Sequence, residues 1–384
     1  MGHRAPRLLV LIAWAHACTP SQVRYETMTL PEPDVRGAEA VLYLVGDAGE
    51  ANPARDAVLD HLSREIESVV GLGSGARVIV AFLGDNLYDA GLPSAPSDED
   101  LEKLGAQVRA LGASPHVRGV FLPGNHDWAD GASLEDGRAA VARQREWVSQ
   151  AAPGHDVQFL PDGGCPGPAS ENVGGSLHLV FIDTEWLLRR PEQGCGTALQ
   201  FYERLAEDLR ENRDRRIIIM SHHPMVSGGP HGGNVAPFEN GPLVYYLVRK
   251  SGANVQDLSS GRYSEMVARL QEAIAASGTR PLVHAGGHDH TLQVIGVEAP
   301  DGPAYQLVSG AGSKSERSRQ VSGTRYATDG FGYMRLDFEA DGVGLTVFAM
   351  DVDGGPVRAV FACRLSTAGE DGSCPQAPLM DEGS

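Results

Sequence analysis

Six short apolar runs between residues 40 and 285 constrain the fold of this chain more than any other feature. Each has the length of a β-strand, and its apolar residues are continuous rather than alternating with polar ones. Because continuous apolarity suits strands that are buried on both faces, we expect these runs to form interior strands. They are AVLYLV at 40–45, ARVIVAFL at 76–83, VRGVFL at 117–122, LHLVFI at 177–182, RRIIIM at 215–220 and PLVHA at 281–285.

Amphipathic helical stretches lie between several of these runs, the clearest at 101–111, 137–151, 199–212 and 263–277. Alternation of strands and helices argues for an α/β architecture. From residue 304 onward the pattern changes to successive strands separated by ADG and DGG turns. For this last part we expect antiparallel pairing.

The N-terminus has the pattern of an export signal. Arg4 and Arg7 precede an apolar run over residues 8–15, and small residues follow it. The protein is therefore expected to be exported and to be periplasmic, anchored to the cell envelope or secreted; a buried N-terminal helix is the alternative. We expect a signal peptide at 1–18, a polar tether at 19–37, a folded domain at 38–365 and a polar tail at 366–384.

The five cysteines agree with export. Cys18, in the AHAC stretch, is a candidate for lipidation, which would tether the protein to a membrane; simple cleavage of the signal peptide is the alternative. Four cysteines then remain, an even number that suits an oxidising compartment. Four cysteines allow three pairings, and reduced cysteines that merely pack are a further alternative. The local pairing would join Cys165 to Cys195 and Cys363 to Cys374.

The formal net charge of −18, from 32 basic and 50 acidic residues, argues against a nucleic-acid partner. The sequence contains no run of Lys or Arg that would form a basic patch. A small anionic substrate would therefore need a local source of positive charge, such as a bound metal ion.

Five strand ends carry polar motifs with metal-binding residue types. In open α/β sheets ligands bind beyond the carboxyl ends of strands, so these loops could converge on one place. Mixed oxygen and nitrogen donors suit Zn, Mn and Fe, and the absence of thiolates from the motifs argues against a structural zinc site. Taken alone, GD after a strand is usually a turn, GNHD could be a helix cap and HDH could be a solvated loop. The motifs are GDAG at 46–49, GDNLY at 84–88, GNHD at 124–127, SHHP at 221–224 and GGHDH at 286–290.

In this order the five motifs resemble the calcineurin-like metallophosphoesterase superfamily, over roughly residues 40–350. Gly49 stands where other branches have a histidine, and Tyr88 resembles the tyrosine of the purple acid phosphatase branch. GGHDHTLQ and the later YQLVSGAGS are similar to the tartrate-resistant acid phosphatases. The resemblance implies an α/β fold in four layers, with two mixed β-sheets flanked by helices. It also implies a phosphomonoesterase of acid phosphatase type that acts by metal-bound hydroxide.

The resemblance further implies two metal ions, Fe(III) and a divalent Fe, Zn or Mn ion. The Fe(III) ligands would be Asp47, Asp85, Tyr88 and His290, and the divalent ligands would be Asp85, Asn125, His222 and His288, with Asp85 bridging. An aromatic that packs under its loop is the alternative for Tyr88.

Other histidines near these motifs are assigned from the same resemblance. His126 and His231 would donate hydrogen bonds to the phosphate and to the leaving oxygen, with a plain loop residue as the alternative for His231. Asp127 would orient His126, and His223 would lie outside the ligand shell beside His222.

The sequence pattern assigns no catalytic or metal-binding role to the remaining candidates. His284 is predicted to be a core residue, and Asp183 is predicted to hold a loop. Segments 91–100, 161–174 and 227–262 are expected to line the substrate entrance. Surface or core positions are expected for His61, His116, His155 and His178.

Two further functions stay open. One is a phosphodiesterase or nucleotide hydrolase on the same metal pair, which only Tyr88 argues against. The other is a non-catalytic, metal-binding surface lipoprotein, which the complete set of ligands argues against. The substrate is expected to be a small phosphorylated molecule, with a phosphoprotein or a nucleotide as alternatives.

Overall fold

The computed structural model describes residues 35–152, 154–189, 194–233, 247, 249, 251–366 and 374–377. The predicted signal peptide, Cys18 and nearly all of the predicted tether lie outside these residues, so export and lipidation stay predictions. Within the described residues, no helix combines the length and the apolarity that a membrane span requires.

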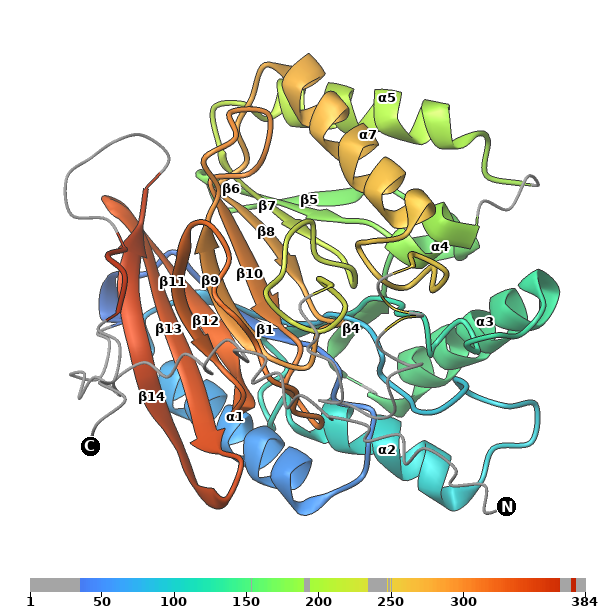
Figure 1. The fold of residues 1–384 in the computed structure, drawn as a ribbon. Helices are drawn as coiled ribbons and strands as arrows, with labels where there is room; N and C mark the ends of the chain where they lie inside the picture. The colour runs from blue at the N-terminus through green and yellow to red at the C-terminus, as the bar shows by residue number, and fades with distance from the viewer. Residues whose placement is uncertain are drawn as a thin grey trace, which may run out of the picture.

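Two seven-stranded sheets form the centre of the described fold (Figure 1). The first sheet has the order β14 (Gly354–Leu365), β13 (Gly342–Asp351), β12 (Phe331–Glu339), β1 (Ala40–Val45), β2 (Arg77–Phe82), β3 (Val117–Phe121), β4 (Asp156–Phe159). The second has the order β11 (Thr324–Thr328), β9 (Leu292–Gly296), β10 (Tyr305–Ser309), β8 (Val283–Gly286), β7 (Arg216–Met220), β6 (Leu177–Phe181), β5 (Ala169–Val173). Each sheet contains parallel and antiparallel pairs, so both are mixed, as predicted.

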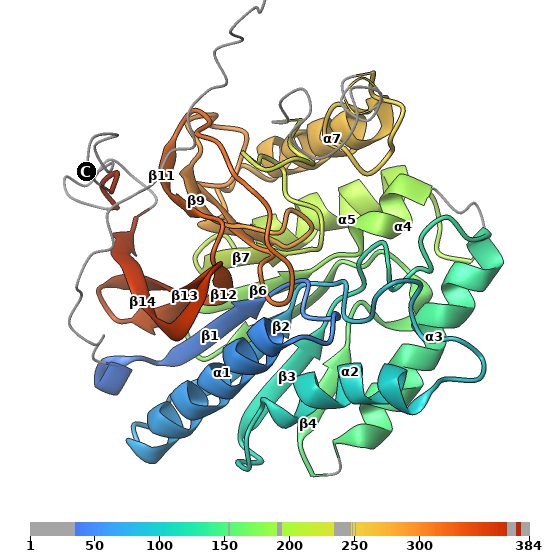
Figure 2. The ribbon, with the colours of Figure 1, turned by 60° about the horizontal axis from the view of Figure 1, so that its bottom comes forward.

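Helices cover the outer face of each sheet (Figure 2). Serine and asparagine caps begin several of them; Asn52 caps the longest, which starts with a proline, and Ser97 forms a capping box. On the first sheet lie α1 (Pro53–Gly71), α2 (Asp98–Arg109) and α3 (Leu134–Ala151), and on the second lie α4 (Thr184–Arg189), α5 (Ala198–Glu211) and α7 (Gly261–Ser277); short 3-10 turns are η1 (Val35–Gly37) and η2 (Asp162–Gly164).

The apolar runs are continuous because each central strand packs on both sides. In β1, Leu42 and Leu44 belong to the core between the two sheets, whereas Val41 and Tyr43 belong to the core between the sheets and the helices. All six residues of β1 are buried. The order helices, sheet, sheet, helices confirms the predicted four-layer sandwich.

Two expectations need correction, and one helix was missed. The strand β10 was expected to pair with the strands that follow it; instead it joins the second sheet, parallel to β8 and antiparallel to β9. Segment 161–174 was expected to be an entrance loop, but it contains η2 and the edge strand β5. Helix α1 was not among the expected helices, although Val58, Leu62 and Ile66 give it a buried stripe.

Both local disulfides are present. The Cα atoms are 5.4 Å apart in Cys165–Cys195 and 4.7 Å apart in Cys363–Cys374. The predicted local pairing is confirmed, and disulfides of this kind form in oxidising compartments.

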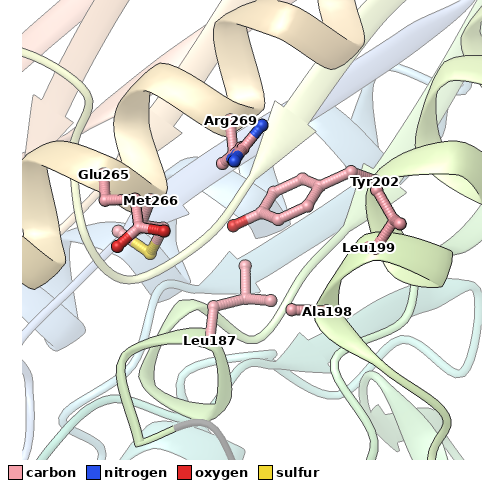
Figure 3. A pocket seen from close by; sticks show the side chains of 7 residues that line it. All are labelled: Leu187, Ala198, Leu199, Tyr202, Glu265, Met266 and Arg269. Carbon is pink, nitrogen blue, oxygen red and sulfur yellow. The ribbon is translucent and has the colours of Figure 1, made fainter.

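A hollow of about 270 Å³ opens between α4, α5 and α7 (Figure 3). None of the residues that line it belongs to the five motifs, so it is separate from the site described below. They are Leu187, Ala198, Leu199, Tyr202, Glu265, Met266 and Arg269.

Candidate metal centre

The five motif loops meet at the seam between the two sheets, where parallel strands of both sheets end. Asp47, Asp85 and Asn125 follow the first-sheet strands β1, β2 and β3, and His222 and His288 follow the second-sheet strands β7 and β8. Direct backbone hydrogen bonds join neighbouring loops, including Asp47 N to Gly84 O at 2.9 Å and Gly287 N to His222 O at 2.8 Å. The predicted convergence of these loops is therefore present in the fold.

One cluster of donors surrounds the Tyr88 hydroxyl. This oxygen lies 3.0 Å from Asp47 Oδ1, 3.0 Å from Asp85 Oδ2 and 3.3 Å from His290 Nε2. A phenol has one proton and can donate to only one of these three atoms. The arrangement leaves acceptor atoms facing one another and so fits a cation. Tyr88 therefore does more than pack under its loop.

A second cluster surrounds the Asn125 side chain. Its Oδ1 atom lies 3.0 Å from His222 Nε2 and 3.2 Å from His288 Nδ1, and these two nitrogens are 3.2 Å apart. Asp85 Oδ1 lies 3.4 Å from His222 Nε2. Asp85 thus presents one carboxylate oxygen to each cluster, which is the arrangement that a bridging ligand requires.

The outer nitrogen of each of these histidines is already occupied. His222 Nδ1 lies 2.8 Å from the Leu83 carbonyl, and His288 Nε2 lies 2.7 Å from the Gln256 carbonyl. A carbonyl only accepts, so these nitrogens carry the protons and the inner nitrogens are left with lone pairs when the rings are neutral. His290 Nδ1 faces the Glu316 carboxylate at 3.3 Å in the same way. Outer partners of this kind orient histidines toward metal ions.

Burial and mutual interactions shift the pKa values of the groups in the two clusters. Burial raises the pKa of Asp47 to about 6. Burial would also raise the pKa of Asp85, but the rings of His222 and His126 hold it below its usual range. Burial would lower the pKa of His222, but Asp85 raises it to about 10. Burial and the two carboxylates raise the pKa of Tyr88 well above its usual value. Metal ligands bind in their deprotonated forms, so a cation bound here would displace protons from these groups.

The motif glycines are required by close approach of the loops. A Cβ atom on Gly84 would lie 2.6 Å from His222 Nδ1, and one on Gly124 would lie 2.3 Å from Asp85 Oδ1. Three of the candidate ligands have left-handed backbone conformations, with φ values of 59° at Asp47, 52° at Asp85 and 69° at His288. Such backbone strain in non-glycine residues is typical of functional sites.

His126 borders the first cluster, but not in the way expected. Its ring contacts the Tyr88 ring edge-on at 4.5 Å, and its Nδ1 atom bonds to the Asp89 carbonyl. The prediction that Asp127 orients this ring is wrong. The Asp127 carboxylate instead accepts hydrogen bonds from the backbone N–H groups of Gly124 and Asn86, because both loops direct unpaired donors at it. Asp127 therefore fixes the loops that carry Asp85 and Asn125.

His231 borders the second cluster, with its ring 4.1 Å from that of His288. Its Nδ1 atom lies 2.8 Å from the buried carboxylate of Asp257, and its backbone N–H donates to Asp289 at 2.7 Å. Arg249 Nη2 lies 3.5 Å from the other ring nitrogen. These contacts hold the ring at the site, unlike a plain loop residue.

His223 lies within 4.8 Å of His222 and His288 through its ring nitrogens, a spacing that could hold a metal. Both nitrogens are engaged elsewhere: Nδ1 lies 2.8 Å from Thr184 Oγ1, and Nε2 lies 2.7 Å from Gln256 Oε1. His223 therefore contacts the loops around His222 through Thr184 and Gln256.

The remaining candidates are structural. His284 is buried between Ser221 and Gln306, which confirms its predicted place in the core. Asp183 accepts hydrogen bonds from the Trp128 indole and the Trp186 backbone, both at 2.9 Å, and so holds the loop after Asn125. Of the other histidines, His178 is buried, His61 and His155 are half-buried, and His116 is exposed.

Four residues near the centre were missed by sequence reasoning: Gln256, Asp257, Lys314 and Glu316. All four lie in polar loops without apolar periodicity, so no local pattern distinguishes them. The expectation that 227–262 lies at the site was the nearest signal, since this segment supplies His231, Gln256 and Asp257.

Comparison with known proteins agrees with this geometry. Residues 41–255, more than half of the chain, match the sequence profile of the calcineurin-like phosphoesterases. A comparison with curated protein sequences gives no significant match. Among solved structures, the fold is similar to GAP50, the anchor in the inner membrane complex of Plasmodium, with a TM-score of 0.56 and 14% identity over 87% of this chain and 90% of that one. It is also similar to PhoD, with a TM-score of 0.53 and 13% identity over 91% of this chain and 76% of that one.

Proposed function

The chain belongs to the calcineurin-like phosphoesterase family, and on this basis we propose that it is a dinuclear-metal phosphomonoesterase of the acid phosphatase type. One observation carries the proposal: two donor clusters share Asp85, which turns one oxygen to each. Pairs of metal ions are a common arrangement in enzymes that hydrolyse phosphate esters, and a shared carboxylate can bridge them.

We assign the two clusters to two metal ions. Asp47, Asp85, Tyr88 and His290 would hold one ion, and Asp85, Asn125, His222 and His288 would hold the other. When bound, the pair supplies Lewis acidity toward phosphoryl oxygens and lowers the pKa of a water molecule.

The two histidines that border the clusters have the remaining roles. His126 and His231 are assigned to hydrogen bonding with the phosphoryl oxygens and with the leaving oxygen, and to protonation of the leaving alkoxide. The Asp89 carbonyl occupies Nδ1 of His126 and leaves Nε2 available. At His231 the Asp257 carboxylate occupies Nδ1, and Arg249 Nη2 lies 3.5 Å from Nε2.

Tyr88 supports the purple acid phosphatase branch. A phenolate is a hard anionic ligand that iron accepts, so Fe(III) is proposed for the first cluster and a divalent Fe, Zn or Mn ion for the second. A nucleotide or a phosphoprotein would satisfy the same chemistry as a small phosphate ester.

Export is proposed from two independent features. Both disulfides need an oxidising compartment to form, and the N-terminal sequence has the order of a signal peptide. Lipidation of Cys18 would then anchor the protein at a membrane.

The test is elemental analysis of the purified protein together with hydrolysis of a phosphomonoester and a phosphodiester. We expect two metal ions per chain, iron among them, and faster monoester hydrolysis at acid pH. Faster diester hydrolysis would favour the phosphodiesterase alternative. A fully metal-loaded protein that hydrolyses neither ester would contradict an enzymatic role.

A further inference from the structure

A lysine lies at the edge of the metal centre, in the loop that follows β10. Lys314 Nζ is 3.4 Å from the centroid of the Tyr88 ring, whose hydroxyl contacts both carboxylates of the first cluster. Lysine is scarce in this sequence: Lys103, Lys250 and Lys314 are its three lysines. In a chain with a net charge of −18, a lysine at this place is a specific local source of positive charge.

The residues on both sides of Lys314 are hydrogen-bonded to loops that carry candidate ligands. On one side, Ser313 Oγ donates to the carbonyl of Asp47. On the other, the backbone N–H of Glu316 donates to the carbonyl of His290 at 2.8 Å. Lys314 is thus held between two loops that carry first-cluster ligands, so little ordering is needed for its ammonium to act there.

In the described part of the chain, the Lys314 ammonium lies against the Tyr88 ring and has no carboxylate partner. The side chain is half-buried, and none of the carboxylates in the described part of the chain forms an ion pair with it. Glu316, two residues further on, faces His290 instead. Lys103 differs, because it is buried, donates to the Tyr88 carbonyl and pairs with Glu99.

We propose that Lys314 binds a phosphoryl oxygen of the substrate and of the orthophosphate product. The inference rests on the proposed phosphoesterase function and adds a substrate-binding residue to it. A compact ammonium with three donors suits a tetrahedral oxyanion, and such charge-assisted hydrogen bonds are among the strong ones. The stacking on Tyr88 keeps the ammonium above the cluster in the absence of an anion.

The first experiment measures orthophosphate binding to the metal-loaded protein by calorimetry, without turnover. Lys314→Met is expected to weaken binding roughly 10- to 100-fold, the range for one lost charge-assisted hydrogen bond. Lys314→Arg, which keeps the charge, should bind several-fold better than Lys314→Met. Arg269→Met is the matched control, because it removes the same charge from the exposed surface of α7 and should stay within about twofold of wild type. Metal content and circular dichroism verify that the variants are folded and loaded.

A second measurement uses the small number of lysines. Reductive ¹³C-methylation of the Zn²⁺-loaded protein gives few methyl resonances, and the Lys314 resonance is identified by its loss in Lys314→Arg. We expect orthophosphate to shift it. An unmoved resonance, or phosphate binding by Lys314→Met that equals the control, overturns the proposal. Wild-type protein that binds phosphate through Lys314 but hydrolyses no ester would instead contradict the proposed function.

Discussion

Replacing Glu316 with glutamine should weaken metal binding at the first cluster and leave the second unchanged. The Glu316 carboxylate lies 3.3 Å from His290 Nδ1, and His290 holds the pKa of Glu316 down, at about 2, against the effect of burial. A hydrogen bond to a charged group contributes about 1.5–3 kcal/mol, which is roughly 10- to 100-fold in affinity. The same range is typical for loss of an outer partner of a metal-binding histidine. Because glutamine keeps an acceptor oxygen, the loss of metal affinity in Glu316→Gln should be near 10-fold. The loss in Glu316→Ala should be near 100-fold.

The assay is competition between the protein and a chelator, which resolves the two metal affinities without measuring turnover. Glu272→Gln is the control, since Glu272 is an exposed residue of α7 that pairs with Arg269. The backbone bond from Glu316 to the His290 carbonyl survives both substitutions, so the loop should stay in place. Equal weakening of both metal affinities, or no weakening in Glu316→Ala, would refute the orienting role.

Three further outcomes are expected. Asp85→Ala should abolish binding of both metal ions and turnover, as elemental analysis and an ester assay would show; retained activity would exclude a bridging role. Tyr88→Phe should remove the visible absorption of an iron-phenolate pair, and a colourless wild-type protein with full iron would exclude the purple branch. Burial lowers the pKa of His284 to about 4. As the pH falls, His284 is therefore protonated in the unfolded chain before it is protonated in the folded one. The free energy of unfolding decreases as the pH drops from 6.5 toward 4. In urea unfolding, the free energy of unfolding of wild type should fall by about 3 kcal/mol more over this pH range than that of His284→Gln. Equal decreases would contradict a buried, neutral His284.

The convergence of the motif loops was predictable because the candidate ligands lie within a few residues of the ends of apolar strands. Parallel strands of one sheet end at the same edge, so Asp47, Asp85 and Asn125 had to lie close together once their strands were recognised. The same reasoning applies to His222 and His288 in the second sheet. A strand and its following loop are local features, and local features can be read from the residue pattern.

The predictions that failed, and the residues that were missed, involve contacts between residues that are far apart in the sequence. Asp127 adjoins His126 in sequence, but its carboxylate turns to backbone donors of two other loops. Glu316 and Asp257 act only because the fold carries their loops to His290 and His231. The sequence also did not predict which sheet β10 joins, because an apolar run does not specify the strand with which it pairs.

The ligands assigned to each metal ion come from both halves of the sandwich, and this has a consequence for the lifetime of the protein. Asp85 belongs to a loop of the first sheet and His222 to a loop of the second, so a cation held by both would cross-link them. Depleting metal should then accelerate amide hydrogen exchange at the strand ends of both sheets together, and should expose the seam to proteases. The availability of metal would in this way decide how long each molecule persists, in addition to whether it is active.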